Sequence, residues 1–139
     1  MKVKFVVLGS PQGKGRPRFS RHGEKLITRT PEATVQYENL IVTEYRRQCG
    51  DCRFGESDML DLRVFAFYEI PKSTSKKKQK AMESGEIRPT KKPDFDNIGK
   101  VVADSLNGVA YRDDAMIVDA QVRKFYSYNP KLEISIQNV

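Results

Sequence analysis

The sequence contains few residues that bind metals through nitrogen or sulfur. Among 139 residues there are one histidine, His22, and two cysteines, Cys49 and Cys52. A closed structural zinc site needs four such ligands, so one chain cannot build it from Cys and His alone. The Cys-x-x-Cys spacing would also suit a redox pair. We interpret the two cysteines as reduced thiols, as is usual in the cytosol.

Long apolar runs are also missing. The N-terminal stretch 1–8 reaches Gly9-Ser10-Pro11 before it collects enough apolar residues for a signal peptide, and no later run approaches the length that spans a bilayer. We therefore expect a cytoplasmic protein without a membrane partner.

The composition indicates one folded domain. Hydrophobic residues make up 38% of the chain, with 7 Phe and 6 Tyr, which is too rich in core-forming residues for a disordered protein. The length suits a single core, and no internal repeat or linker divides the chain. We predict one α/β (α+β) domain over residues 1–139, with a mixed β-sheet packed by helices.

Residue patterns predict the elements of this domain. Apolar alternation predicts strands at 2–8, 60–68, 116–126 and 132–136, with the 60–68 strand buried on both faces and the last two strands forming a hairpin. Helices are expected at 31–48, 76–84 and 94–107. We expect Thr30 to cap the first helix, Ser75 to cap the second and Asp94 to cap the third.

The net charge of +7 favours a polyanionic partner, although charge alone does not separate nucleic acid from an anionic membrane or from simple solubility. The positions of the basic residues along the chain are more informative. Residues 9–25 form a basic, glycine-rich segment that we expect to be a flexible loop, ordered on DNA binding, with a hairpin strand near Leu26-Ile27. It resembles a P-loop only superficially, because Gly15 follows Lys14 where Ser or Thr is required.

We expect this loop to place arginines on the DNA backbone. Phe19 can wedge or stack at a DNA junction, or equally pack into the protein or a dimer partner. His22 is expected to be an exposed loop residue. The early turns of the 76–84 helix carry four lysines, where the helix dipole disfavours positive charge, so DNA phosphates are one explanation and a solvated charged face is the other. The predicted DNA contacts are Lys14, Arg16, Arg18, Arg21, Lys76, Lys77, Lys91 and Lys92.

Acidic residues gather around the start of the third helix. Asp94 and Asp96 flank its N-terminus, and Mg²⁺ is usually held by one or two such carboxylates together with waters and substrate phosphate. A third acid is available in Asp113-Asp114. Lys100 lies one turn beyond Asp96, where a cation can stabilise charge on a phosphate under attack. The alternative is structural, because Asp is a common helix cap and Asp-x-Asp is a weak pattern.

The combined spacing is more specific. Pro93-Asp94-x-Asp96-Asn97-x-x-Lys100, then Asp104-x-Leu106-Asn107-Gly108 and Asp113-Asp114, resembles the signature of the RusA family of Holliday-junction resolvases, common in phages and prophages. The basic Gly-Lys-Gly-Arg-Pro-Arg-Phe loop is also similar to that family.

The resemblance implies a homodimer that resolves four-way DNA junctions in recombination and repair by paired nicks, through water activated by Mg²⁺, with Mn²⁺ as the alternative ion. It places the catalytic carboxylates and metal ligands at Asp94, Asp96 and Asp114, with Asp113 as the alternative ligand. It also implies a catalytic role for Lys100 and a supporting role for Asn97. Two other functions fit the same residues: a nuclease for flap or other branched DNA, and a non-catalytic DNA-binding module.

Overall fold

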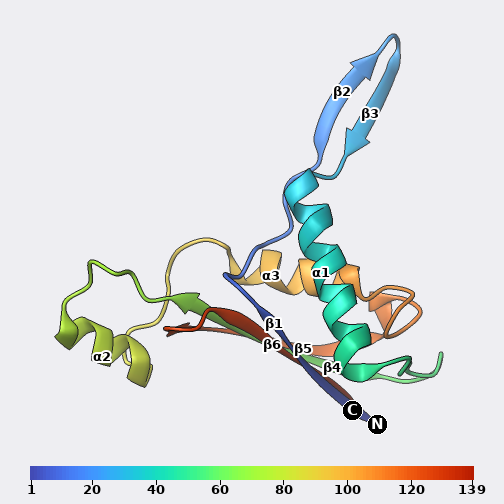
Figure 1. Cartoon of the computed structure of the whole chain (residues 1–139). Coiled ribbons are helices and arrows are strands. Elements are labelled where there is room, and N and C mark those ends of the chain that lie inside the picture. Colours follow the sequence, from blue (N-terminus) through green and yellow to red (C-terminus); the bar gives the residue numbers. More distant parts are fainter.

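The computed structural model describes all residues, 1–139, and contains a four-stranded mixed sheet (Figure 1). Its strands are β1 (Lys2–Leu8), β4 (Leu60–Glu69), β5 (Ile117–Ser127) and β6 (Lys131–Asn138), in the spatial order β1-β6-β4-β5. Strand β6 is antiparallel to β1 and β4, whereas β5 runs parallel to β4. A mixed sheet with helices confirms the predicted fold class.

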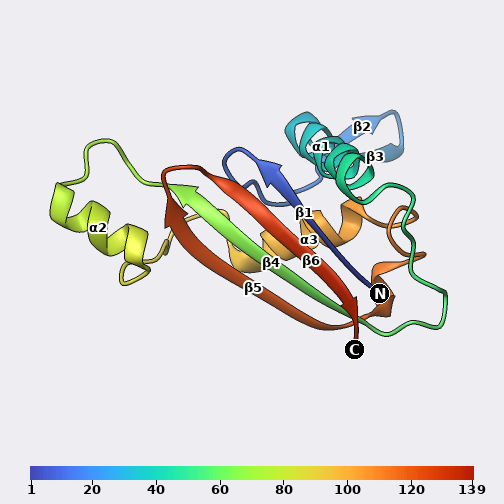
Figure 2. The same cartoon turned by 60° about the horizontal axis from the view of Figure 1, so that its bottom comes forward.

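Three α-helices accompany the sheet: α1 (Glu32–Cys49), α2 (Lys76–Ser84) and α3 (Phe95–Ser105). Helices α1 and α3 lie against the same face of the sheet, while α2 stands beyond one end of it (Figures 1 and 2). Helix α2 has the predicted bounds, with Ser75 accepting a hydrogen bond from the Lys78 backbone and Gly85 ending the helix at φ 88°. None of the three helices combines the length and apolar composition needed to cross a membrane.

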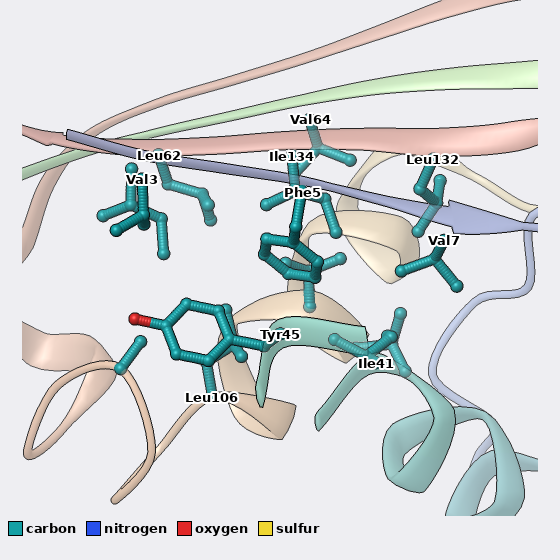
Figure 3. Close-up of a cluster of buried hydrophobic side chains, with 14 of the residues drawn as sticks. Val3, Phe5, Val7, Ile41, Tyr45, Leu62, Val64, Leu106, Leu132 and Ile134 are labelled. Atoms are coloured by element: carbon teal, nitrogen blue, oxygen red, sulfur yellow. The ribbon is translucent and has the colours of Figure 1, made fainter. Parts of the chain in front are cut away.

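The core fills the space between the sheet and helices α1 and α3. Alternate side chains of the strands point toward the helices, which is the expected result of the two-residue period of a strand. Figure 3 shows them meeting Ile41 and Tyr45 of α1 and Leu106 at the end of α3. The Phe5 and Tyr45 rings pack edge to face with centroids 5.3 Å apart. This packing fixes α3, and therefore the acidic segment, against β4 and β5.

Two predictions about strands were wrong. Strands β5 and β6 do not form a hairpin, because β4 lies between them. Strand β4 ends at Glu69, before Pro71, so the short connection from β5 to β6 can pass over its end, where the Ile70 backbone donates to Ser127. Strand β4 is also fully buried on one face only, since Phe65 and Phe67 on the other face remain partly exposed.

The basic segment forms more regular structure than a loop. Strands β2 (Arg18–His22) and β3 (Lys25–Arg29) pair as an antiparallel hairpin, here called the arm, which extends away from the body beyond the start of α1 (Figure 1). Order that appears only on DNA binding stays a prediction. The expected Thr30 cap was wrong, because Pro31 is the N-cap residue of α1 and no side chain bonds the helix start.

Candidate active site

The two acids at the start of α3 are not used as helix caps. Asp94 occupies the N-cap position with extended backbone, yet its side chain makes no capping hydrogen bond. Asp96 lies in the first turn, and both residues are exposed. Their carboxylates therefore remain free, next to backbone N–H groups and a helix dipole that favour negative charge. This removes the purely structural interpretation of Asp94 as a cap.

Two residues of the sheet hold the segment that leads into Asp94. The Tyr68 hydroxyl on β4 donates a hydrogen bond to the Pro93 carbonyl. The Lys124 ammonium on β5 donates to the Lys91 carbonyl at 2.7 Å and lies 5.0 Å from the centre of the Tyr68 ring. Burial raises the pKa of Tyr68 and lowers that of Lys124, while the nearby Asp94 charge raises both. The positively charged Lys124 side chain therefore lies near Asp94, on the side of the sheet.

The glycine-rich start of the basic segment lies directly on α3. A Cβ atom at Gly13 would be 2.8 Å from the Asn97 Cβ, a separation that requires one of them to move. The Lys14 backbone donates to the Asn97 carbonyl at 3.0 Å. Asn97 therefore anchors the loop on α3, while its predicted supporting role in catalysis stays a prediction.

Lys14 differs from the other predicted DNA contacts. Its ammonium lies 3.3 Å from Glu38 of α1 and 3.5 Å from Asp104 of α3, and its side chain is 20% exposed. A lysine with two carboxylate partners is well placed to join the loop to both helices. The contact between Lys14 and DNA stays a prediction.

A basic groove leads past Asp94. One hollow of about 520 Å³ is lined by residues of the loop and of the α3 start, including Arg16, Lys92 and Asp94. A second hollow shares Lys92 and Pro93 with the first and continues along Lys91 and Lys72. Together they form one groove that we call the Asp94 groove. Its basic lining suits a nucleic-acid backbone.

The remaining acidic pair lies at the other end of α3. The Asp114 backbone donates to the Asn107 side chain at 2.8 Å, which fixes the start of β5. The pKa of Asp114 is raised, first by burial, then by a hydrogen bond with Asp113 and by the Asp104 charge. Asp104 precedes Ser105, the last residue of α3. Asp114 therefore lies next to Asp104 and Asp113, and not next to Asp94.

The helix keeps the predicted carboxylates apart within one chain. Asp104 lies ten positions after Asp94, which corresponds to about 15 Å of helix. Lys100, between them, shares a groove of about 350 Å³ with Asp114, against β5. No group of three or more His, Cys, Asp or Glu residues is placed to hold a metal ion. One chain brings together Asp94 with the basic groove, and Lys100 with Asp114.

The other predicted DNA contacts lie at the periphery. In the arm, Arg18 pairs with Arg29 on one face, whereas Phe19 and Leu26 project from the opposite face. Phe19 is 66% exposed, and His22 is an exposed strand residue. Lys76 and Lys77 are exposed on α2.

Sequence patterns did not identify Tyr68, Lys124 or Glu38 as parts of this region. Tyr68 and Lys124 fall within predicted strands and Glu38 within a predicted helix, and no sequence pattern links them to the site. Glu38 lies 24 positions after Lys14, so no pattern of neighbouring residues indicates their ion pair. Tyr68 and Lys124 lie two positions apart in the register of β4 and β5, so their proximity could have been found only if the pairing of these two strands had been predicted.

Comparison with known proteins agrees with the predicted resemblance. The sequence matches the family described as endodeoxyribonuclease RusA over residues 9–137. It is also 39% identical to the uncharacterized protein YqaN of Bacillus subtilis (strain 168) over 140 residues, an alignment that covers 99% of this chain and 96% of that protein. The family match includes the arm, the Asp94 groove and both acidic clusters. The chain therefore belongs to the RusA family of endodeoxyribonucleases.

Proposed function

We propose that this nuclease is a Mg²⁺-dependent resolvase that cuts four-way DNA junctions by paired, symmetric nicks. The observation that carries the proposal is the position of Asp94, a carboxylate free of any capping bond that lines a hollow whose other charged side chains, Lys14, Arg16 and Lys92, are basic. Basic side chains attract the phosphate backbone, and the carboxylate offers a place for the cation that a phosphodiester-cleaving site needs.

The donor chemistry at the start of α3 fits a hard cation. Asp94 and Asp96 offer exposed carboxylate oxygens, the ligands that Mg²⁺ prefers, and Mn²⁺ accepts the same type of ligand. When bound, the ion would activate water and polarise the scissile phosphate. The chain's own residues position the reaction. Lys124 and Tyr68 hold the backbone before Asp94, and Lys100 neutralises charge that develops on the phosphate.

The DNA path in this proposal follows the Asp94 groove toward the arm. Arg16 and Lys92 line the groove, and Arg18, Arg21 and Arg29 extend the positive charge along the arm. An isolated two-stranded hairpin is marginally stable in water, so contact with DNA would stabilise the arm. The exposed Phe19 would stack on, or wedge between, bases at the branch point.

A second chain supplies the third carboxylate in this proposal. The support is the separation within one chain, where Asp114 lies beside Asp104 at the far end of α3. In a two-fold symmetric homodimer, Asp94 and Asp96 of one chain would act with Asp114 of the other. Such a dimer presents two equivalent sites, as two symmetric nicks require.

Cleavage assays test the activity and its substrate. Purified protein is incubated with synthetic four-way, flap and linear duplex DNA, with and without Mg²⁺. We expect metal-dependent cleavage of the four-way junction and a loss of about 100-fold or more in Asp96→Asn. The matched control is Asp51→Asn, an exposed aspartate outside the site. No metal-dependent cleavage of any substrate would contradict the nuclease, and preference for flaps would contradict the resolvase.

Mixing two inactive variants tests the shared site. In a heterodimer of Asp96→Asn with Asp114→Asn, one of the two shared sites keeps both aspartates. We therefore expect the mixture to recover nicking that neither variant has alone. If every site lies within one chain, both sites of the heterodimer carry a substitution, and the mixture stays inactive.

A further inference from the structure

One face of the four-stranded sheet has no helix over it. Helices α1 and α3 cover the other face, and Figure 2 shows the sheet in front of α3. The residues of β4 that point away from these helices are Asp61, Arg63, Phe65, Phe67 and Glu69. We call this side of the sheet the open face. A sheet face that meets water usually carries polar side chains, so the two phenylalanines are unusual there.

Three phenylalanine rings meet on the open face. Phe125 of β5 is opposite Phe67 in the strand register, and the two rings stack with centroids 5.5 Å apart and an interplanar angle of 24°. The Phe65 ring contacts the Phe125 ring edge to face, with centroids 6.1 Å apart. All three residues are half-buried. The rings therefore form one continuous aromatic surface that water still reaches in part.

Cations lie over these rings. The Arg123 guanidinium lies 5.2 Å from the centre of the Phe125 ring and 5.7 Å from that of Phe65. The Lys131 ammonium lies 5.3 Å from the centre of the Phe67 ring. The negative face of an aromatic ring attracts such cations, and their outer side remains available to an anion. Aromatic and positively charged groups are therefore interleaved on the open face.

A hollow of about 320 Å³ beside the rings extends the positive charge toward β1. It is lined by three cations and one of the rings: Lys2, Lys4, Arg63 and Phe65. Its one acidic lining residue, Glu133, lies 3.6 Å from the Lys131 ammonium, to which it is ion-paired. Arg63 is bound to Asp61 at 3.2 Å, yet its side chain is 50% exposed. The hollow therefore has an excess of positive charge.

We propose that the open face binds single-stranded DNA, with bases stacked on the phenylalanine rings and phosphates held by the surrounding cations. A positively charged groove with aromatic stacking positions is how proteins hold single strands without sequence preference. Phe65 and Phe67 are two positions apart on one strand, which corresponds to about 7 Å. This is twice the rise of about 3.4 Å per stacked base, so two neighbouring unstacked bases can each take one ring. A duplex keeps its bases stacked inside and offers no such contact.

This site goes beyond the proposed nuclease site, because it lies on the opposite side of the sheet. The two surfaces are joined around the end of β5. Arg88 lies 4.4 Å from the centre of the Phe125 ring on the open face, whereas Lys91 lies over Tyr126 on the helix-covered face. Asp94 follows three positions after Lys91. A single strand on the open face would therefore leave the Asp94 groove free for a duplex.

Binding titrations without divalent ions test the site, because the proposed cleavage needs a metal ion. The probe is a fluorescent oligonucleotide of about 12 thymidines. We expect Phe65→Leu with Phe67→Leu to weaken its binding at least about 10-fold, since leucine keeps most of the apolar volume but offers no ring. Phe19→Leu, in the arm, is the matched control and should bind as the unmodified protein does.

Three results of these titrations would overturn the proposal. The first is equal affinity of the double variant and the unmodified protein for the oligonucleotide. The second is an equal loss in Phe19→Leu, which would place the strand on the arm. The third is an equal loss of affinity for a linear duplex, which would mean that the rings do not select single strands. Circular dichroism on each preparation verifies that the variants are folded.

Salt dependence tests the cations without changing the rings. Arg63 and Arg123 are both exposed, so their loss should preserve the fold. If each contacts one phosphate, Arg63→Ala with Arg123→Ala should reduce the slope of log affinity against log salt by about 1.4 for the oligonucleotide. Arg46→Ala, an exposed residue of α1, should leave the slope unchanged. An unchanged slope in the double variant would mean that the strand binds elsewhere.

Sedimentation distinguishes a DNA site from a contact between copies of the chain. We expect the phenylalanine double variant to have the same mass in solution as the unmodified protein. A lower mass would mean that the open face binds a second copy, and would overturn the proposal. Cleavage of four-way DNA is measured separately, so a wrong single-strand site and a wrong nuclease activity give different results.

Discussion

The Tyr68 hydroxyl donates a hydrogen bond to the carbonyl of Pro93, the residue immediately before Asp94. The bond joins strand β4 to the segment that starts α3. With the Lys124 bond to Lys91, it fixes the backbone of the candidate site from the sheet side. Tyr68 thus links the core, where its ring is buried, to a carboxylate at the surface.

Tyr68→Phe should lower the cleavage rate while preserving the fold. The variant keeps the ring and loses one hydrogen bond, which contributes about 0.5–1.5 kcal/mol to stability. We expect a drop in kcat larger than the change in DNA affinity, because the carboxylate is displaced while the basic groove remains. Single-turnover cleavage and DNA-binding titrations on the same preparation measure the two effects. A kcat equal to that of the unmodified protein would show that the bond does not position Asp94.

Gly13→Ala should displace the loop from α3. The added Cβ would be 2.8 Å from Asn97 and 3.1 Å from Pro93, so overpacking should cost about 1–3 kcal/mol in the free energy of unfolding. Chemical denaturation measures this change. Gly55→Ala is the matched control, because its nearest neighbour would lie at 3.4 Å and its φ is not positive. Equal free energies of unfolding for the two variants would mean that the loop accommodates the added methyl group without loss of stability.

Asp114→Asn should raise thermal stability at neutral pH while it abolishes cleavage. Burial and neighbouring acids raise the pKa of Asp114, so its charged form is less favourable in the folded chain than in the unfolded chain. The folded state then binds more protons, and stability falls as the pH rises from the unfolded pKa of about 3.9 through the raised folded value.

The gain in stability of Asp114→Asn over the unmodified protein should therefore be complete above the folded pKa of Asp114 and absent below its unfolded pKa. Melting temperatures of the variant and the unmodified protein, measured without divalent ions from pH 3 to pH 8, check the sign. Asp51→Asn should show no such divergence. If Asp114→Asn were less stable at pH 7, the carboxylate would have to be stabilised by its surroundings.

Loss of the two facing arginines of the arm should reduce the salt dependence of DNA binding. Arg18 and Arg29 form a cross-strand pair of like charges, an unfavourable arrangement that bound phosphates would relieve. If each contacts one phosphate, Arg18→Ala with Arg29→Ala should reduce the slope of log affinity against log salt by about 2. Arg46→Ala, on the exposed side of α1, is the control. An unchanged slope would mean that the arm does not contact the backbone of DNA.

The sequence by itself was sufficient for local features. The caps and bounds of α2, the apolar face of α3 and the position of Asp94 at its start depend on neighbouring residues, because capping and helical periodicity act within a few positions. The spaced acidic motif likewise indicated the family, since it is contiguous in the chain.

Tertiary structure decided which of these parts meet. The parallel pairing of β4 with β5, in place of the expected hairpin of β5 with β6, brings the Lys124 ammonium to 5.0 Å from the Tyr68 ring, and both side chains bond the segment before Asp94. The rigid length of α3 separates Asp94 from Asp114, although both belong to one short motif. Strand order and helix length are set by how apolar faces pack together, and that packing involves residues far apart in the sequence.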